Sequence, residues 1–336
     1  MKIAILTPTF SHYSGIDRVA QLQAMNYVKK GNEVLVYALQ GYIKPRNFRL
    51  EILGMPNNLF LQRLYRLFFF LDFGKISSTA KKIKDCDIVI SHFYPMNLIA
   101  SYAKKKYNVK YVYHNHGIGY SRLFNNIFEK FYMVLFGFFN RLSLRNADEA
   151  VSISRFLQRE LKKETGLDSR LLYNKIDKSR FKKGIDGSKV RKALKIKENE
   201  KLLLFIGRLS PHKNIHTLLK IFQSVHQKLP DCKLVVVGNP SFPAYYNRLR
   251  RMSNKNVIFR NFVEDTELPY YYAACDLYVT ASLWEGFNLP AAEAQACGKK
   301  VVAFDVCSHP EIVRNGILVK NGDFDGFVEA VLKILK

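Results

Sequence analysis

The sequence predicts an α/β protein with two doubly wound parallel-sheet domains in succession. Short apolar runs typical of buried strands alternate with stretches whose apolar residues recur at helical spacing, which is the pattern of β-α-β units. This alternation stops over the polar stretch 173–200 and then starts again. A chain of 336 residues can hold two domains with a core each. We therefore expect domains at 1–172 and 201–336, joined by a linker at 173–200.

The first domain begins with a complete β-α-β unit. Apolar runs at 3–6 and 34–39 read as strands, and Asp17–Lys30 between them has apolar residues at helical spacing. Gly31 is the kind of residue that ends a helix. Further expected elements are strands 87–90, 110–113 and 150–153, and helices 98–106 and 122–145.

The second domain begins at the apolar strand 202–207. Before it, the linker is rich in Lys, Asp, Gly and Ser and lacks apolar periodicity, which is typical of an exposed connection. The elements expected after strand 202–207 are helices 215–228 and 325–335, and strands 233–238, 257–259, 277–279 and 301–304.

Composition indicates a globular protein with a strong positive charge. Hydrophobic residues make up 48% of the chain, and its net charge at pH 7 is +25. Such a surface attracts nucleotide sugars, anionic lipids, acidic polymers or RNA. The first apolar run is too short for a signal peptide, and no run is long enough to span a bilayer. Together with five scattered cysteines, which are typical of free thiols, this predicts a cytoplasmic protein.

Two loops of the second domain carry suitable chemistry for a ligand, because parallel sheets bind ligands beyond the carboxyl ends of their strands. After strand 202–207, Gly207 permits close backbone approach, and Arg208 and Lys213 place two cations beside a helix start. This combination suits a diphosphate, although a solvated basic loop is the alternative.

The second loop follows strand 277–279 and holds two carboxylates. Glu285 precedes Pro290, which favours the first turn of a helix, and Glu293 falls on that helix. Both can accept hydrogen bonds from vicinal hydroxyls, as in a sugar or a ribose. The backbone N–H groups of 286–288 can bind an anion or an oxygen lone pair. Two surface glutamates are the alternative for this loop alone.

These motifs resemble those of the retaining glycosyltransferases of family 4, the "glycosyl transferases group 1". Glu285-x7-Glu293 matches the E-x7-E signature, and G-R-L-S-P-H-K-N from Gly207 and S-H-P-E ending at Glu311 lie on either side of it. Matching segments earlier in the chain are 14–19 at the first βα turn, His116 after strand 110–113, 146–154 and 173–181. The resemblance implies the GT-B fold, in which two Rossmann-like domains face an interdomain cleft.

It also implies a role for each matching residue. Arg208 and Lys213 neutralise the diphosphate leaving group, Glu285 holds the donor sugar, and His116 contacts that sugar from the first domain. The implied donor-binding residues are Gly15, whose N–H meets the phosphate, Glu293, which binds the ribose, and Gly207, Gly286, Phe287, Asn288 and Leu289. Ile16, Lys175 and Asn288 stand where the family commonly has glycine, and the side chains at 16 and 288 narrow the cleft near the donor.

The implied reaction moves a hexose from a UDP- or GDP-linked sugar to a hydroxyl of a glycan or a lipid-linked saccharide, as in polysaccharide or glycolipid synthesis. No cofactor and no metal are expected, because the two cations and a helix dipole stabilise the leaving group. The acidic triplets at 85–87 and 323–325 lie beside a strand and in a glycine-rich loop, so we do not expect them to bind a metal.

Two aromatic stretches lie in the first domain. In 124–144, Phe124, Phe128, Phe131, Leu135 and Phe138 recur at helical spacing, which predicts core packing. The stretch 59–70 combines apolar and aromatic residues with two arginines, so an interfacial helix on an anionic membrane competes with core packing. A membrane-bound form would lie on the inner face.

Three other functions fit parts of the sequence. A sugar-nucleotide epimerase would share the fold, but the E-x7-E match disfavours it. A nicotinamide-dependent enzyme would need G-x-G-x-x-G after strand 3–6, which is absent. A basic nucleic-acid-binding protein would fit the charge, but the sequence has no recognisable RNA module and no basic stripe, so no nucleic acid is expected.

Overall fold

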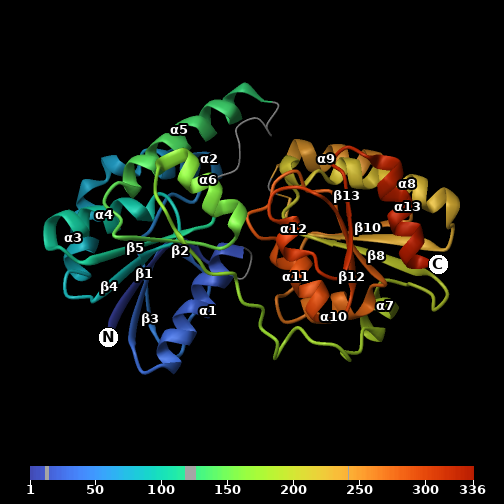
Figure 1. The fold of residues 1–336 in the computed structure, drawn as a ribbon, viewed down its shortest axis with the longest axis horizontal. Helices are drawn as coiled ribbons and strands as arrows, with labels where there is room; N and C mark the ends of the chain where they lie inside the picture. The colour runs from blue at the N-terminus through green and yellow to red at the C-terminus, as the bar shows by residue number, and fades with distance from the viewer. Residues whose placement is uncertain (12–14, 118–125, 241) are drawn as a thin grey trace. The chain divides into compact units, whose positions relative to one another are not determined.

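The computed structural model describes residues 1–11, 15–117, 126–240 and 242–336. The chain divides into two compact units, Met1–Asn174 and Lys175–Lys336, and each is built on a parallel β-sheet with helices on both faces (Figure 1). This confirms the predicted fold class. Within the described ranges, no helix combines the length and the apolar character needed to cross a membrane.

The first unit has a seven-stranded sheet in the order β3-β2-β1-β4-β5-β6-β7. Ile5 of β1 lies beside Val36 of β2 on one side and Ile90 of β4 on the other, so the strand order reverses at β1. The strands are β1 (Lys2–Phe10), β2 (Glu33–Gly41), β3 (Arg49–Ile52), β4 (Ile88–Ser91), β5 (Lys110–Asn115), β6 (Glu149–Ser152) and β7 (Arg170–Leu171). The helices are α1 (Gly15–Lys29), α2 (Leu59–Leu67), η1 (Phe69–Leu71), α3 (Phe73–Lys82), α4 (Met96–Tyr107), α5 (Ile127–Leu144) and α6 (Arg155–Thr165).

The buried strands of this sheet contribute side chains to two cores, one on each face, because successive side chains point to opposite faces. Leu6 packs against the α3 and α4 side. Ile5 packs against Ala20 and Ala24 of α1 on the other face. The short side chains of α1 let the helix lie close to the strands.

The second unit has a six-stranded sheet in the order β10-β9-β8-β11-β12-β13. The strand order reverses at β8, which pairs with β9 and β11. The strands are β8 (Lys201–Ile206), β9 (Cys232–Val237), β10 (Val257–Arg260), β11 (Leu277–Thr280), β12 (Lys300–Phe304) and β13 (Gly316–Val319). The helices are α7 (Ser188–Ala193), η3 (Pro211–Lys213), α8 (Ile215–Lys228), α9 (Pro243–Met252), α10 (Leu268–Ala274), α11 (Leu289–Ala296), α12 (His309–Ile312) and α13 (Phe324–Leu335).

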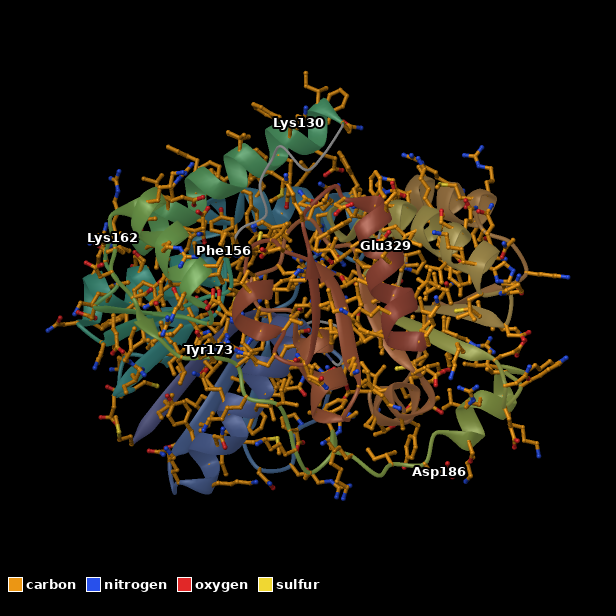
Figure 2. The ribbon with its side chains drawn as sticks, turned by 45° about the vertical axis from the view of Figure 1, so that its right-hand side comes forward. Lys130, Phe156, Lys162, Tyr173, Asp186 and Glu329 are labelled. Carbon is orange, nitrogen blue, oxygen red and sulfur yellow. The ribbon has the colours of Figure 1, made fainter. Side chains whose placement is uncertain are left out.

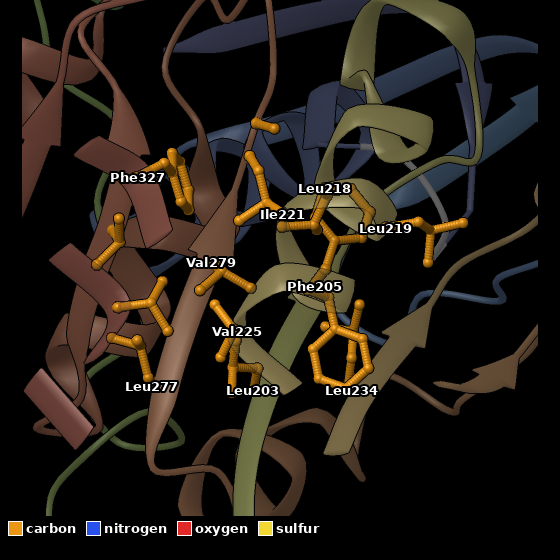
Figure 3. Packing of buried hydrophobic residues seen from close by; sticks show 14 of the residues in the cluster. Leu203, Phe205, Leu218, Leu219, Ile221, Val225, Leu234, Leu277, Val279 and Phe327 are labelled. Atoms are coloured by element: carbon orange, nitrogen blue, oxygen red, sulfur yellow. The ribbon is translucent and has the colours of Figure 1, made fainter. Parts of the chain in front are cut away.

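The core of this second unit also lies on both faces of its sheet. Phe205 of β8 packs in the cluster that holds Leu218 of α8 and Phe327 of α13 (Figure 3). Its neighbour Leu204 points to the other face, where Tyr272 of α10 lies. Side chains on both faces of β8 are therefore buried in apolar cores, and polar groups lie at its carboxyl end.

Several elements of the structure are not among those expected from the sequence. They include β3, α3 and α6. The expected helix 122–145 begins at Ile127 in the structure, and residues 118–125 lie outside the described ranges. Within 173–200, where the sequence predicts a linker, Leu194 and Ile196 are buried in the core of the second unit. These side chains attach the stretch to that unit although it lacks apolar periodicity.

Candidate functional site

The loop after β8 places a glycine and two cations at the carboxyl end of the second sheet. The N–H of Gly207 donates to the carbonyl of Val237 at 3.0 Å. A Cβ atom on Gly238 would lie 1.8 Å from the Gly207 carbonyl oxygen, so this close approach requires glycine. Arg208 is exposed at this end of the strand, whereas Lys213 is half-buried at the end of η3.

Lys213 and Glu285 form a buried ion pair. The Nζ atom of Lys213 lies 2.6 Å from Oε1 of Glu285, and their side chains are 17% and 8% exposed. The hydroxyl of Ser308 donates to the Glu285 carbonyl at 3.0 Å, which holds the loop before α11 against α12. Two residues that the sequence assigned to separate parts of the donor are therefore in direct contact.

Asn288 caps α11 and connects it to α12. It adopts a left-handed backbone conformation, with φ of 69°, and its Oδ1 accepts the N–H of Ala291 at 3.2 Å. The N–H of His309 Nδ1 donates to the Phe304 carbonyl at 2.7 Å, so its Nε2 accepts from the Asn288 amide at 2.8 Å. A positive φ explains why glycine is common here, and asparagine tolerates it better than most residues.

Glu293 points into the core side of α11. Its carboxylate is almost completely buried and accepts a hydrogen bond from the Tyr272 hydroxyl at 2.8 Å. Tyr272 was not among the predicted residues, and its place on α10 brings it to the carboxylate. Ser308 and His309 belong to the S-H-P-E motif, but the sequence assigned no role to them. Gly286, Phe287 and Leu289 are buried between Glu285 and Glu293.

Two histidines beside this ion pair remain neutral at physiological pH. Burial lowers the pKa of His212 well below its ordinary value of 6.5, and the cations of Lys213 and Arg208 lower it further. Burial also lowers the pKa of His309, against the opposing effect of Glu285. The positive charge of this region therefore comes from lysine and arginine.

In the first unit, Gly15 begins α1 just after β1. Residues 12–14, which include the matching Ser14, lie outside the described ranges. The carboxylate of Asp17 accepts hydrogen bonds from the backbone N–H of Ser11 at 3.0 Å and from the Thr9 hydroxyl at 2.8 Å. It thereby ties the start of α1 to the end of β1, where an anion would meet the helix N-terminus.

His116 follows β5 and belongs to a buried cluster of histidines. Its Nε2 atom lies 2.9 Å from Nδ1 of His92 and 3.2 Å from Nδ1 of His114. His92 follows β4, and its Nε2 lies 2.8 Å from Oε1 of Gln23 on α1. Burial lowers the pKa values of all three rings, that of His114 to about 4. Within the described ranges, these three form the only group of His, Cys, Asp or Glu placed to hold a metal ion.

The prediction of core packing for 124–144 is wrong for three of its phenylalanines. Phe128, Phe131 and Phe138 of α5 are 80%, 64% and 50% exposed, and Figure 2 shows side chains projecting outward around Lys130 on this helix. Phe124 lies outside the described ranges. Helical spacing of apolar residues does not tell a helix facing the core from one facing outward.

Comparisons with known proteins match both units. The family profile "Glycosyltransferase Family 4" covers residues 13–180, and "Glycosyl transferases group 1" covers 186–336. An O-antigen chain mannosyltransferase B of Escherichia coli is 33% identical over 141 residues, which cover 40% of this chain and 36% of that protein. A D-inositol 3-phosphate glycosyltransferase of Mycobacterium ulcerans is 33% identical over 171 residues, 48% of this chain and 36% of that one. The matched part thus spans about a third of each of these relatives.

Solved structures extend the likeness of fold to the whole chain. The Anabaena protein HepE, crystallised in complex with UDP-glucose, has a TM-score of 0.81 at 21% identity, over 100% of this chain and 90% of that one. The fold of two parallel-sheet domains is therefore shared over all of this chain. At this identity the likeness concerns the fold alone.

Proposed function

Because this chain belongs to glycosyltransferase family 4, we propose that it is a retaining, metal-independent hexosyltransferase that uses a nucleotide-diphosphate sugar. The ion pair of Lys213 and Glu285 is the observation that carries the proposal. It holds a cation and a carboxylate side by side beyond the carboxyl ends of β8 and β11, where doubly wound sheets bind nucleotides. Both side chains are largely removed from water, where a contact with a charged or polar ligand is stronger than in bulk solvent.

The roles proposed for the chemistry follow from these groups. Lys213 and Arg208 stabilise the negative charge that develops on the diphosphate as its bond to the sugar carbon breaks. Glu285 and the backbone of 286–289 hold the sugar hydroxyls, and Glu293 binds the ribose. The acceptor oxygen bonds to the same face of that carbon, and its proton passes to a leaving diphosphate oxygen. Charge and proton thus balance without a metal or a covalent intermediate.

His116 and Gly15 complete the proposed set from the first unit. The Nε2 atom of His116 faces His92 and His114, so its Nδ1 is the ring nitrogen that we assign to a hydrogen bond with a sugar hydroxyl. The N–H of Gly15 lies at the start of α1, where the helix dipole favours a phosphate oxygen.

The donor and acceptor are proposed from chemistry and from relatives. HepE was crystallised with UDP-glucose, which supports a UDP-linked hexose as the first donor to test, with GDP-linked sugars as the second. The Escherichia coli relative is named for an O-antigen chain, which supports a glycan or lipid-linked acceptor in polysaccharide or glycolipid synthesis.

Nucleotide release from UDP-glucose and GDP-mannose tests the proposal, with NMR of the product's anomeric proton. Glu285→Gln and Lys213→Ala should each reduce turnover by at least about 100-fold, the loss typical of one electrostatic contact to a transition state. Glu329→Ala, at an exposed glutamate on α13 (Figure 2), and Lys220→Ala, at an exposed lysine on α8, are matched controls. Undiminished turnover in Glu285→Gln, or an inverted product, would refute the assignment.

We also infer that the enzyme docks on the inner face of an anionic membrane through an apolar face of the first unit. This face consists of exposed side chains of two helices that are in contact, α2 and α5: Leu59, Phe60 and Leu61, and Ile127, Phe128, Phe131 and Val134. Arg63 of α2 joins them, since its Nη1 lies 2.7 Å from Oε1 of Glu129. Exposed Lys130 and the net charge of +25 favour anionic lipid over a neutral partner.

Co-sedimentation with vesicles of phosphatidylglycerol or of phosphatidylcholine tests the docking. Phe128→Glu with Phe131→Glu should abolish binding to the anionic vesicles, and high salt should weaken binding of the unmodified chain. Phe324→Glu, at a half-exposed phenylalanine of the second unit, should bind normally. Equal binding of the double variant, or no binding of the unmodified chain, would exclude this face.

A further inference from the structure

We propose that His92, His114 and His116 form a binding site for a divalent transition metal ion, with Zn²⁺ as its first candidate. The rings lie at the carboxyl ends of β4 and β5, next to the point where the strand order of the first sheet reverses. Their relative exposures are 0%, 3% and 7%. The inference does not depend on the proposed function, which assigns no metal to the diphosphate.

The sheet itself produces the cluster. Ser91 of β4 is paired in register with Tyr113 of β5, so the next residues, His92 and His114, lie side by side. His116 follows His114 by two positions and projects toward the same face. The ligand atoms of the three rings lie within 4.8 Å of one another.

Hydrogen bonding alone does not satisfy the three converging nitrogens. If Nε2 of His116 carries a proton, it must be shared between the Nδ1 atoms of His92 and His114, at 2.9 and 3.2 Å. If that nitrogen carries no proton, it faces a second bare lone pair on His92. A metal ion accepts all three lone pairs at once, and neutral imidazole is the ligand form it requires.

Gln23 supplies the outer contact that imidazole ligands usually have. Its Oε1 lies 2.8 Å from Nε2 of His92, so the Nε2–H donates to it and the Nδ1 lone pair is left pointing into the cluster. Metal-bound histidines almost always donate their other N–H to such an acceptor, which sets the tautomer and the ring orientation.

The two spacings from His116 are close to those of a tetrahedral ion. Zn–N bonds of about 2.0–2.1 Å place the nitrogens of a tetrahedral site about 3.4 Å apart. The distances of 2.9 and 3.2 Å from His116 Nε2 to the Nδ1 atoms of His92 and His114 are a few tenths of an ångström shorter. All three ligand atoms lie within 4.8 Å of one another, so metal binding would also adjust the spacing between His92 and His114. Within the described ranges no fourth His, Cys, Asp or Glu joins the group, so water or an anionic oxygen would complete the coordination, as in three-histidine zinc sites.

Metal uptake by the full chain, stripped with a chelator, tests the proposal directly. Titration with Co²⁺ should produce the visible bands of a tetrahedral nitrogen site, Zn²⁺ should remove them, and elemental analysis should find one Zn²⁺ per chain. His92→Asn and His114→Asn should lose this equivalent. His216→Asn and His226→Asn in the second unit should retain it.

Gln23→Ala keeps the proposal testable if the histidine variants fail to fold. It leaves all three ligands in place and should weaken Zn²⁺ affinity about 10- to 100-fold, the usual effect of removing an outer contact. Gln21→Ala is its matched control on the same helix, because that amide donates to the Ser11 carbonyl instead. Absence of uptake by the unmodified chain, or uptake unchanged in Gln23→Ala and His92→Asn, would overturn the site.

Discussion

Replacing Lys213 with methionine removes the cation that pairs with Glu285 and leaves a side chain of similar length. The Glu285 carboxylate, with its side chain 8% exposed, would then be a buried charge without this partner. Breaking a buried pair in this way costs about 3–5 kcal/mol, whereas an exposed pair contributes about 1 kcal/mol or less. We expect the larger loss. Glu285→Gln should cost less, because the Lys213 ammonium can turn toward water on its flexible stem.

Urea unfolding followed by tryptophan fluorescence measures the free energy of unfolding of the second unit, which holds the ion pair. Trp284 is the only tryptophan of the chain and precedes Glu285, so its emission reports on the second unit even if the two units unfold separately. The double variant Lys213→Met, Glu285→Gln should recover most of the lost free energy of unfolding, since neither charge remains. Lys220→Met on α8 is the control for an exposed lysine.

A loss below about 1 kcal/mol in Lys213→Met would refute this reasoning, because it would place the pair among solvent-screened surface contacts. A double variant no more stable than Lys213→Met would also contradict it. That result would mean that packing around the lysine stem, and not its charge, stabilises the loop.

Three further outcomes can be checked by the same unfolding measurement. Tyr272→Phe removes the hydroxyl that donates to Glu293 at 2.8 Å and should cost about 1.5–3 kcal/mol, as for hydrogen bonds to charged groups. Asn288→Ala should be less stable than Asn288→Gly by about 1–2 kcal/mol, because alanine at a φ of 69° meets the left-handed steric cost that glycine avoids. Stability of the second unit should fall as pH drops below about 6.5, by up to about 1.4 kcal/mol per pH unit for each of His212 and His309. Burial lowers the pKa values of these two histidines in the folded protein, so the unfolded chain takes up protons first as the pH falls. A stability that does not change with pH would contradict this assignment. A Tyr272→Phe variant of normal stability would contradict the role of the tyrosine hydroxyl.

The alternation of strands and helices could be predicted because it depends on the local spacing of apolar residues. Strand 202–207 and helix 215–228 match β8 and α8 within a residue. Elements whose stability comes from distant partners could not be predicted this way. Leu194 and Ile196 are buried in the core of the second unit although the stretch around them lacks apolar periodicity.

The candidate residues of the second unit were predictable as a set. Gly207, Lys213, Glu285 and Glu293 are recognised from the spacing of short motifs, and the rule that ligands meet the carboxyl ends of strands places them at one edge. Their roles toward a donor stay predictions. The contact between Lys213 and Glu285 joins positions 72 residues apart, so their pairing needed the sheet.

The sequence by itself determined the α/β class and the family, and it predicted the residues to which the donor chemistry is assigned, because these depend on local periodicity and on short motifs. The tertiary structure decided which of those side chains touch, and it alone brought His92 beside His114 and His116. It also decided that Phe128, Phe131 and Phe138 of α5 are exposed. Burial and pairing are properties of the packed sheet and of its strand register, and neither is encoded in the spacing of residues along one segment.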